Sequence, residues 1–471
     1  MNNKKVIWVL SFFSILFLGL IVYLTTMNIY YNDEYVQSNY NQRNTLAESK
    51  IKRGTIYDRN GTVLAYSELD DNGGQKRIYP YENLYSHVIG YSSSQYGKSL
   101  IEKQYNEDLL GQNNFKQVFS IKRLFEKNTT DGDNLTLTID HKLQKKAASL
   151  MKRYKGALVA MNPKTGEILA MVSMPDFNPS EDALSSNWAS LNSDENSPFL
   201  TRATMGMYAP GSTYKIITAA AILESNLEDE IVDDTTGKIH IGDKDISNSG
   251  GSIYGKTDLE KGFIKSSNVY FAKMGSDINY TVHRDLAQRF LLGNKIPFDF
   301  PISKSKYDTS RMGPLDCAIA SIGQGKTLMT PLHLALVACT IANDGAMPKP
   351  YIVSKVTSDD STISKAQKST IANPISANTA KIIKDYMRDV VKSGTGTAAA
   401  LYGYDVCGKT GTAENEMTIT DESKTHAWFV GFAPYDNPEI AICVIMENAG
   451  FGGSVAAPVA REVMRTYFNN K

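Results

Sequence analysis

The sequence has no excess of charge of either sign. Its 471 residues carry 50 lysines and arginines against 50 aspartates and glutamates, so the formal net charge is zero. Proteins that gain affinity from phosphate contacts usually carry a basic excess or a basic stripe, so the balance argues against nucleic acid as a partner. The same balance excludes an acidic solvating tail. With 42% hydrophobic residues, the composition is that of a globular protein of two or three domains.

Cysteine and histidine are scarce and scattered. The four cysteines include no C-x-x-C pair and are too few for a disulfide scaffold, so we expect small buried apolar side chains at Cys317, Cys339, Cys407 and Cys443. The six histidines show no metal-ligand spacing, and there is no G-x-S-x-G motif. The sequence therefore predicts no metal site, no cofactor and no Ser-His-Asp hydrolase, and structural roles for His333 and His426.

One long segment near the N-terminus carries no charge at all. The run from Val6 to Met27 has 22 residues, and as a helix it would span roughly 33 Å, enough to cross a bilayer core. Lys4 and Lys5 precede it, whereas Asp33 and Glu34 follow it, so the positive-inside rule places the N-terminus in the cytoplasm. A cleaved signal peptide is the alternative. The run is longer than a usual signal core and ends without an A-x-A-like site, which favours an uncleaved single-pass anchor.

The remaining chain divides by its pattern of turns and apolar runs. We expect a cytoplasmic tail at 1–5, a transmembrane helix at 6–27, a stalk and pedestal domain at 28–140 and a larger domain at 141–471. Hairpins are predicted at 55–65 and 156–172. The same pattern predicts a helix capped by Asp140, helices at 213–225, 331–342 and 380–392, strands at 427–433 and 440–446, and surface loops near 178–198 and 355–376.

Two glycine-rich matches to nucleotide-binding patterns fail on their context. Gly403–Thr410 fits the phosphate-loop pattern, but turn-like sequence follows where an apolar helix should open. Gly394–Ala399 fits a loose dinucleotide pattern, but it follows a predicted helix where a strand is required. Gly394 is better interpreted as the C-terminal cap of that helix.

A serine and a lysine stand three residues apart at the start of an apolar helix. Ser212 and Lys215 would share one face of its first turn. The free N–H groups of a helix N-terminus suit an oxyanion developing beside Ser212. A lysine among apolar residues is hard to keep charged, so Lys215 could accept the proton of the serine. This S-x-x-K pattern alone is weak evidence.

Two further motifs follow in an order that suits acyl transfer. Ser266-Ser267-Asn268 comes after Ser212 in the chain, and Lys409-Thr410-Gly411-Thr412 comes after both. These motifs supply a hydroxyl that can relay a proton, an amide that can hold a substrate, a fixed cation, and hydroxyls for a carboxylate. The three motifs together are a known signature of β-lactamases and penicillin-binding proteins.

With these motifs, the chain resembles class B penicillin-binding proteins, which are monofunctional peptidoglycan D,D-transpeptidases. The resemblance covers nearly all of the chain beyond the apolar run. It includes two pedestal motifs, the entry to the catalytic domain and two further signposts, at Arg53–Gly61, Ile101–Gly111, Leu135–Asp140, Ser321–Gly325 and Gly394–Gly396. The implied fold is α+β: a penicillin-binding/β-lactamase-like serine transpeptidase domain with an antiparallel sheet between helices, a smaller α+β pedestal and one transmembrane helix.

The resemblance also implies a role for each motif residue. Ser212 would be acylated by a stem peptide ending in D-Ala-D-Ala, with Lys215 as general base. Ser266 and Asn268 would relay the proton and hold the substrate. The terminal carboxylate of substrate or β-lactam would bind Lys409, Thr410 and Thr412, and the backbone N–H groups of Ser212 and Thr412 would form the oxyanion hole. A side chain at Gly411 would obstruct a substrate pairing with the strand edge.

Partners and alternatives follow from the same resemblance. The implied location is the bacterial cell membrane, with the catalytic domain outside, and the implied protein partner is a polytopic membrane glycosyltransferase. A D,D-carboxypeptidase, in which water resolves the acyl-enzyme, stays open, as does a catalytically silent scaffold. A β-lactamase is disfavoured because no E-x-x-L-N segment is present, and the stretch between anchor and catalytic domain leaves too little room for a polymerase domain.

Overall fold

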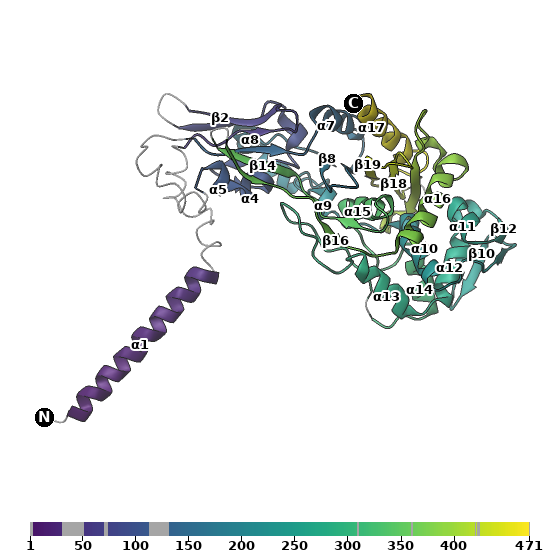
Figure 1. Cartoon of the computed structure of the whole chain (residues 1–471), viewed down its shortest axis with the longest axis horizontal. Coiled ribbons are helices and arrows are strands. Elements are labelled where there is room, and N and C mark those ends of the chain that lie inside the picture. Colours follow the sequence, from purple (N-terminus) through teal and green to yellow (C-terminus); the bar gives the residue numbers. More distant parts are fainter. Residues whose placement is uncertain are drawn as a thin grey trace.

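The computed structural model describes residues 3–30, 51–69, 74–112, 131–308, 310–358, 361–419, 421 and 424–470. Figure 1 shows the N-terminal helix α1, a pedestal around β2 and β14, and a larger α+β part that ends with helix α17. The expected α+β class is confirmed. The stalk predicted after the apolar run lies largely outside the described residues.

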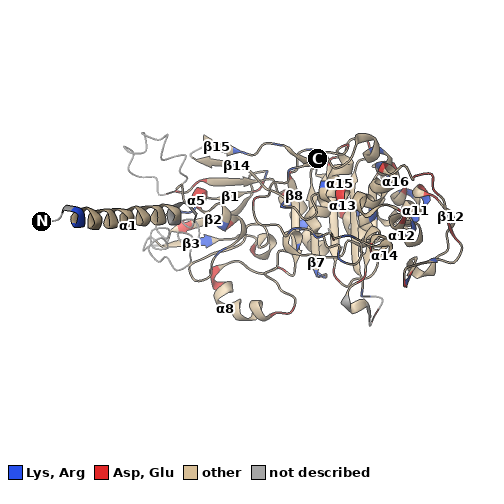
Figure 2. Cartoon of the chain, turned by 90° about the horizontal axis from the view of Figure 1, so that it is seen from below, with Lys and Arg blue, Asp and Glu red and all other residues tan. Residues whose placement is uncertain are grey.

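Helix α1 (Asn3–Tyr30) contains the whole apolar run. Its segment Lys4–Thr26 has a mean hydropathy of 2.5 and is not buried against the rest of the protein, so by length and composition it can cross a membrane. Lys4 and Lys5, expected in a tail, lie in its first turns, and the cations are confined to this end of the helix (Figure 2). The helix therefore fits a membrane anchor.

The pedestal is built on a six-stranded sheet that draws strands from two distant parts of the chain. The strand order is β15-β14-β6-β1-β2-β3. The bounds are β1 Ile56–Tyr57, β2 Val63–Leu69, β3 Gln75–Ile78, β6 Asn134–Leu137, β14 Val353–Ser358 and β15 Ser361–Lys365. The predicted hairpin of β1 and β2 is confirmed. The surface loop expected near 355–376 is wrong: β14 pairs antiparallel with β6, and a division at residue 140 leaves out two strands of this sheet.

A buried carboxylate between two buried arginines holds the pedestal together. Glu102 accepts hydrogen bonds from Arg53 Nε at 2.6 Å and Arg77 Nε at 2.7 Å. Arg53 also donates to the backbone oxygen of Glu102, and Arg77 donates to that of Gly54. Burial raises the pKa of Glu102, but the two guanidiniums outweigh burial and hold it below its ordinary value. Arg53–Gly61 and Ile101–Gly111, the two pedestal motifs, thus meet at one ion cluster.

The larger domain contains a five-stranded antiparallel sheet in the order β17-β18-β19-β7-β8. Its strands are β7 Gly156–Met161, β8 Ile168–Met174, β17 Cys407–Ala413, β18 His426–Ala433 and β19 Ile440–Met446. Alternate residues face opposite sides. Val430 and Cys443 pack in one core with helix α15, and Phe429 and Val444 pack in the other with α7 and α17. The expected antiparallel sheet between helices is confirmed.

Two helices beside this sheet begin directly after the N-cap residues that the sequence predicted. Asp140 and Thr330 accept hydrogen bonds from the backbone N–H groups of Leu143 and His333, as N-caps do. Figure 1 shows α7 and α17 together. The bounds are α7 His141–Met151, α9 Arg202–Met205, α10 Lys215–Glu224, α11 Leu259–Lys265, α12 Asn268–Asp277, α13 Tyr280–Arg289, α14 Pro314–Ser321, α15 Pro331–Ala342, α16 Ala377–Ser393 and α17 Ala456–Asn469.

One predicted loop is a helix. Residues 178–198 include α8 (Glu181–Ser193), with Ser180 as its N-cap. Its composition misled the prediction because only Leu184 is buried and its other residues are largely polar. Trp188 anchors the helix by stacking on Tyr96 of the pedestal, with ring centroids 3.9 Å apart.

Short elements complete the structure. Two small antiparallel sheets, β9 with β12 and β10 with β11, lie in the segment between α10 and α11. The bounds are β4 Ser92–Ser93, β5 Gly97–Lys98, β9 Val232–Asp234, β10 Lys238–Ile241, β11 Lys244–Ser247, β12 Gly255–Thr257, β13 Met347–Pro348, β16 Thr370–Ala372, α4 Leu100–Gln104, α5 Asn106–Leu109, η1 Glu82–Tyr85, η2 Gly211–Tyr214, η3 Ser249–Gly251, η4 Thr397–Ala399 and η5 Glu416–Ile419.

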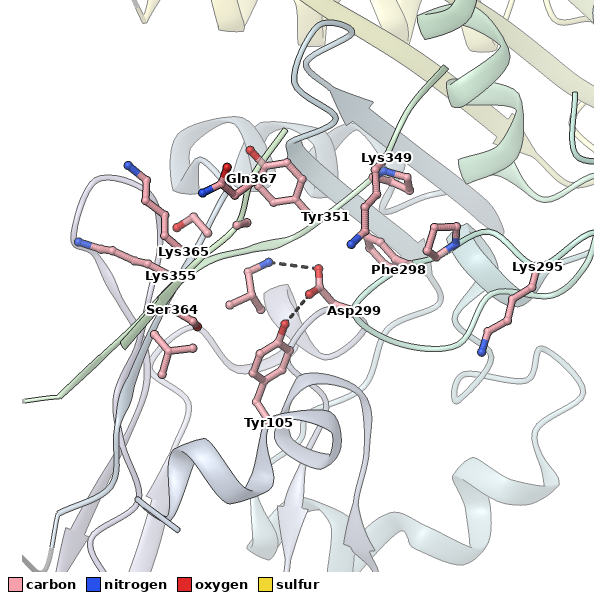
Figure 3. Close-up of a pocket in the computed structure, with 16 residues that line it drawn as sticks. Tyr105, Lys295, Phe298, Asp299, Lys349, Tyr351, Lys355, Ser364, Lys365 and Gln367 are labelled. Carbon is pink, nitrogen blue, oxygen red and sulfur yellow. Dashed lines mark hydrogen bonds between the residues drawn. The ribbon is translucent and has the colours of Figure 1, made fainter. Parts of the chain in front are cut away.

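A pocket of about 580 Å³ marks the joint between the pedestal and the larger domain (Figure 3). The Asp299 carboxylate, from the larger domain, accepts hydrogen bonds from the Tyr105 hydroxyl of the pedestal and from the backbone N–H of Ile352. Lys355 and Lys365 point away from Asp299, so the lysines at the rim do not converge on one point. The contacts of Asp299 tie the two parts of the chain to each other.

We predict that Glu102→Ala destabilises the protein strongly. Removing the carboxylate leaves two buried guanidiniums without a counter-ion, which typically costs about 3–5 kcal/mol. Thermal and urea unfolding measure the change, and Glu107→Ala on the neighbouring exposed surface is the matched control. A Glu102→Ala protein as stable as the control would contradict the assigned role.

Candidate active site

The serine of the S-x-x-K motif lies on a short turn before the helix. Residues Gly211–Tyr214 form the 3₁₀ turn η2, and Lys215 is the first residue of α10. Ser212 is half-buried, whereas Lys215 is completely buried. The sequence predicted one helix for both residues; the tighter turn places the serine at the surface of the site and the lysine beneath it.

Lys215 is held by the S-x-N motif. Its Nζ atom donates to Asn268 Oδ1 and to the backbone oxygen of Ser266, both at 2.7 Å, and lies 3.4 Å from Ser266 Oγ. It also lies 5.4 Å from the centroid of the Phe271 ring. The two motifs, well separated in the sequence, therefore meet as predicted.

Ser266 connects this lysine to a second one. Lys409 Nζ donates to Ser266 Oγ at 2.7 Å. Ser266 ends α11 in the left-handed region, with φ of 58°, which few non-glycine residues adopt. This conformation lets the backbone oxygen of Ser266 face Lys215 while its hydroxyl faces Lys409. The third motif thus joins the other two through one serine.

The lysine-threonine motif lies on strand β17 at the edge of the central sheet. Lys409 is completely buried, Thr410 is 6% exposed and Thr412 is half-buried. A Cβ atom at Gly411 would lie 2.9 Å from Thr213 Cγ2 and 3.0 Å from Trp428 Cβ. The missing side chain therefore makes room for η2 and Trp428, in addition to the access for a substrate that the sequence predicts.

The two signposts predicted from the resemblance also contact the site. The backbone N–H of Gly211 donates to the oxygen of Gly323, which belongs to the segment Ser321–Gly325. Thr395, in the Gly394–Gly396 segment, shares a hydrogen bond of 2.6 Å between its hydroxyl and that of Thr410. Both segments therefore buttress residues of the motifs.

Burial sets the charge state of both lysines. It holds the pKa of Lys215 well below its ordinary value, and the nearby Lys409 cation lowers that pKa further. Burial lowers the pKa of Lys409 to about 7. Desolvation penalises the charged ammonium, so burial favours the free amine of Lys215. A lysine in this state can act as a general base.

Several residues that shape the site have no motif in the sequence. Trp428 Nε1 donates to the backbone oxygen of Ala209, just before the serine turn. Glu447 accepts hydrogen bonds from Tyr208 and from the buried Arg202, each at 2.7 Å. These contacts join residues that are far apart in the sequence, so no local pattern could have revealed them.

The alternative interpretations of the motifs fail in the structure. Lys409 and Thr410 lie inside strand β17, so the phosphate-loop arrangement, which needs a helix there, is not formed. His333 is a structural residue, as predicted: its ring nitrogens contact Ser305 Oγ and the oxygen of Phe290 at 2.7 Å. All four cysteines are buried. Within the described residues, no group of acidic, histidine or cysteine side chains could hold a metal ion.

Comparison with family models gives the same assignment as the motifs. Residues 156–465 match the penicillin binding protein transpeptidase domain, and residues 53–135 match the penicillin binding protein A dimerisation domain. The chain belongs to the penicillin-binding protein transpeptidase family. The class B resemblance predicted from the sequence is confirmed.

Three relatives of known identity are similar to this chain over most of its length. The peptidoglycan D,D-transpeptidase PbpA of Mycolicibacterium smegmatis is 33% identical over 458 residues, covering 89% of this chain and 90% of the relative. The ceftriaxone acyl-enzyme complex of penicillin-binding protein A from M. tuberculosis has a TM-score of 0.84 at 29% identity, covering 89% of this chain and 99% of that one. A D,D-transpeptidase domain from Eggerthella lenta has a TM-score of 0.80 at 33% identity, with 89% and 99% covered.

We predict a bell-shaped pH dependence for the second-order rate constant of acylation by a penicillin. The rate rises from acid pH as Lys215 loses its proton, because only the free amine is a base. It falls as pH passes the Lys409 pKa of about 7, because the cation that attracts the carboxylate is lost. Lys409→Arg keeps the charge and should remove the alkaline limb. An alkaline limb that Lys409→Arg leaves in place would contradict this assignment.

Proposed function

We propose that the chain is a peptidoglycan D,D-transpeptidase that works through an acyl-enzyme on Ser212 and is a target of β-lactams. The observation that carries the proposal is the meeting of Lys215, Lys409 and Ser266 beside the serine turn. The relatives named above are D,D-transpeptidases, and the structural neighbour carries a β-lactam as an acyl-enzyme. A scaffold without catalytic activity would have no need for two buried lysines, Lys215 and Lys409, that both contact Ser266.

The first half-reaction transfers the acyl group to the enzyme. Lys215 accepts the proton of Ser212, whose oxygen attacks the carbonyl carbon between the two terminal D-alanines of a stem peptide. The backbone N–H groups of Ser212 and Thr412 stabilise the oxyanion, each worth about 10²–10³ in rate. The peptide C–N bond then breaks, and the departing D-alanine amine takes up a proton relayed through Ser266.

The second half-reaction forms the cross-link. An amino group of another stem peptide attacks the ester carbon, forms the new amide bond and returns the oxygen of Ser212 to the hydroxyl state. Lys215 accepts a proton from the attacking amine and returns a proton to the oxygen of Ser212, because this step is the chemical reverse of the first half-reaction. Asn268 holds the substrate through its amide.

The edge of the sheet is the proposed binding surface for the donor. Strand β17 pairs with β18 and, within the described part of the chain, ends the sheet, so its outer edge can pair with an extended peptide. Lys409, Thr410 and Thr412 bind the terminal carboxylate of substrate or drug on this strand, and Gly411 keeps the strand close to the serine turn.

Membrane topology and the protein partner are part of the proposal. Helix α1 anchors the chain with its lysines in the cytoplasm, and the catalytic domain lies outside the bacterial cell membrane, where peptidoglycan is assembled. A polytopic membrane glycosyltransferase is the proposed partner, because a monofunctional transpeptidase needs glycan chains made by another protein. Labelling of intact cells by a membrane-impermeant penicillin tests the topology.

The deciding experiment is labelling with a fluorescent penicillin. Wild-type protein in membranes should take up label, and intact-mass and peptide analysis should place one adduct on Ser212. Ser212→Ala should take up none. A folded wild-type protein that takes up no label would overturn the enzyme and favour a scaffold.

We predict that Lys215→Ala lowers the acylation rate by about 10²–10⁴-fold, the usual contribution of a general base. Its thermal stability should stay close to wild type, because the change also removes a buried polar amine that is costly to desolvate. Lys273→Ala, which alters an exposed lysine of α12, is the matched control for both measurements. Extensive unfolding of Lys215→Ala would indicate a structural lysine.

Transpeptidation and hydrolysis are separated by the product. With a donor peptide ending in D-Ala-D-Ala and an amine acceptor, we expect mass spectrometry to find the amide-linked product, which Ser212→Ala should not form. Hydrolysed donor as the sole product would favour the D,D-carboxypeptidase instead.

A further inference from the structure

An asparagine outside the motifs lies directly behind the S-x-N segment. Asn248 Oδ1 accepts two hydrogen bonds, one from Ser267 Oγ at 3.1 Å and one from the backbone N–H of Val269 at 3.0 Å. Ser267 and Val269 are the residues on either side of Asn268. The amide oxygen of Asn248 therefore binds both sequence neighbours of Asn268, the asparagine that accepts a hydrogen bond from Lys215.

The nitrogen of this amide is fixed to strand β9 and to the loop that precedes β12. Asn248 Nδ2 donates to Asp234 Oδ2 at 2.5 Å and to the backbone oxygen of Ser252 at 2.8 Å. Asp234 in turn accepts a hydrogen bond from the backbone N–H of Gly237. Asn248 is 3% exposed and Asp234 is 1% exposed. All four hydrogen-bonding positions of the Asn248 amide are used, which fixes its orientation.

The residue before Asn248 holds the catalytic asparagine itself. Asn268 Nδ2 donates to the backbone oxygen of Ser247 at 2.8 Å, which leaves Asn268 Oδ1 directed at Lys215. Ser247 and Asn248 thus fix the orientation of Asn268 and the position of its two neighbours. The amide of Asn268 cannot flip without losing the contact to Ser247.

This support matters because the backbone at Ser266 is strained. A non-glycine residue in the left-handed region costs about 1–3 kcal/mol and persists only where its surroundings hold it. Ser266 has φ of 58° and precedes Ser267, which Asn248 anchors. The backbone oxygen that faces Lys215 depends on this conformation.

We propose that Asn248, backed by Asp234, is a positioning residue for the acylation step. It fixes the Ser266–Asn268 segment so that the oxygen of Ser266 and Oδ1 of Asn268 meet Lys215. The inference rests on the proposed function, since it concerns the same serine and lysine. Asn248 contacts neither reacting atoms nor substrate and acts through Ser267 and Val269.

The identity of the side chain is part of the inference. Aspartate at 248 would keep the acceptor oxygen for Ser267 but would turn a carboxylate toward Asp234. Two carboxylates at this distance in a buried site repel each other strongly. Changing Asp234 to asparagine restores a donor and an acceptor between the two positions. The pair Asn248→Asp and Asp234→Asn therefore exchanges the partners and keeps one hydrogen bond.

The test measures acylation of the full chain in detergent by a fluorescent penicillin, with binding constant and first-order acylation rate resolved separately. The variants are N248A, N248D, D234N/N248D and the control T236A, whose exposed hydroxyl donates to the backbone oxygen of Lys238 in the bend between β9 and β10. Thermal unfolding is recorded for each.

We expect N248A and N248D to lower the first-order rate by about 10- to 100-fold, the usual cost of misplaced catalytic groups. The binding constant should weaken less than the first-order rate, because Lys409, Thr410 and Thr412, which bind the carboxylate, lie on β17 and only Asn268 of the substrate-holding residues belongs to the supported segment. D234N/N248D should recover most of the loss seen in N248D, and T236A should match wild type.

Each contrary result is decisive. N248A and N248D proteins that acylate within about 2-fold of wild type would overturn the role of Asn248 and leave the proposed function intact. A loss in N248D that D234N/N248D does not reduce would also overturn it, because the exchange restores the contact to position 234. A wild-type protein that is not labelled at all overturns the proposed function instead.

Discussion

The site depends on the burial of two lysines, Lys215 and Lys409, whose amines both contact Ser266. Among the residues that the structure describes, neither Lys215 nor Lys409 has a carboxylate as a hydrogen-bond partner, and both lysines are completely buried. Two desolvated ammonium groups this close repel each other, so the protein favours a state in which one of them is neutral. The proposed chemistry follows from that constraint, because a lysine whose pKa is lowered can be neutral, and so act as a base, at a pH where a free lysine would be protonated.

Such an arrangement is stable only if the acceptors that hold the amines are themselves fixed. Ser266 supplies two of them from a strained backbone, and Asn268 supplies the third. Hydrogen bonds from the segment 247–248 hold this turn from behind, and Lys215 of α10 and Lys409 of β17 contact it from the side of the site. The two small sheets are thus connected to the catalytic residues, although they lie outside the main sheet.

Much of this could be predicted from the sequence, and the failures have physical reasons. The three motifs predicted the residues that meet at the site, because their chemistry needs fixed residue types. Capping residues such as Thr330 marked helices correctly because capping is local. Strand β14 was missed because its partner β6 lies in a distant part of the chain. Helix α8 was missed because most of its residues are polar, so the sequence shows no helical repeat of apolar residues there. Asn248 was not predicted because its role exists only in the contacts that the fold brings together.

The packing around Gly411 shows how the fold sets the width of the site. The space beside its Cα is filled by Thr213 and Trp428. Because no side chain separates them, the serine turn rests directly on β17. The distance between the nucleophile and the strand edge is therefore fixed by close packing of backbone. A peptide paired with the outer edge of β17 would meet Ser212 at a position that the sheet, and not the substrate, determines.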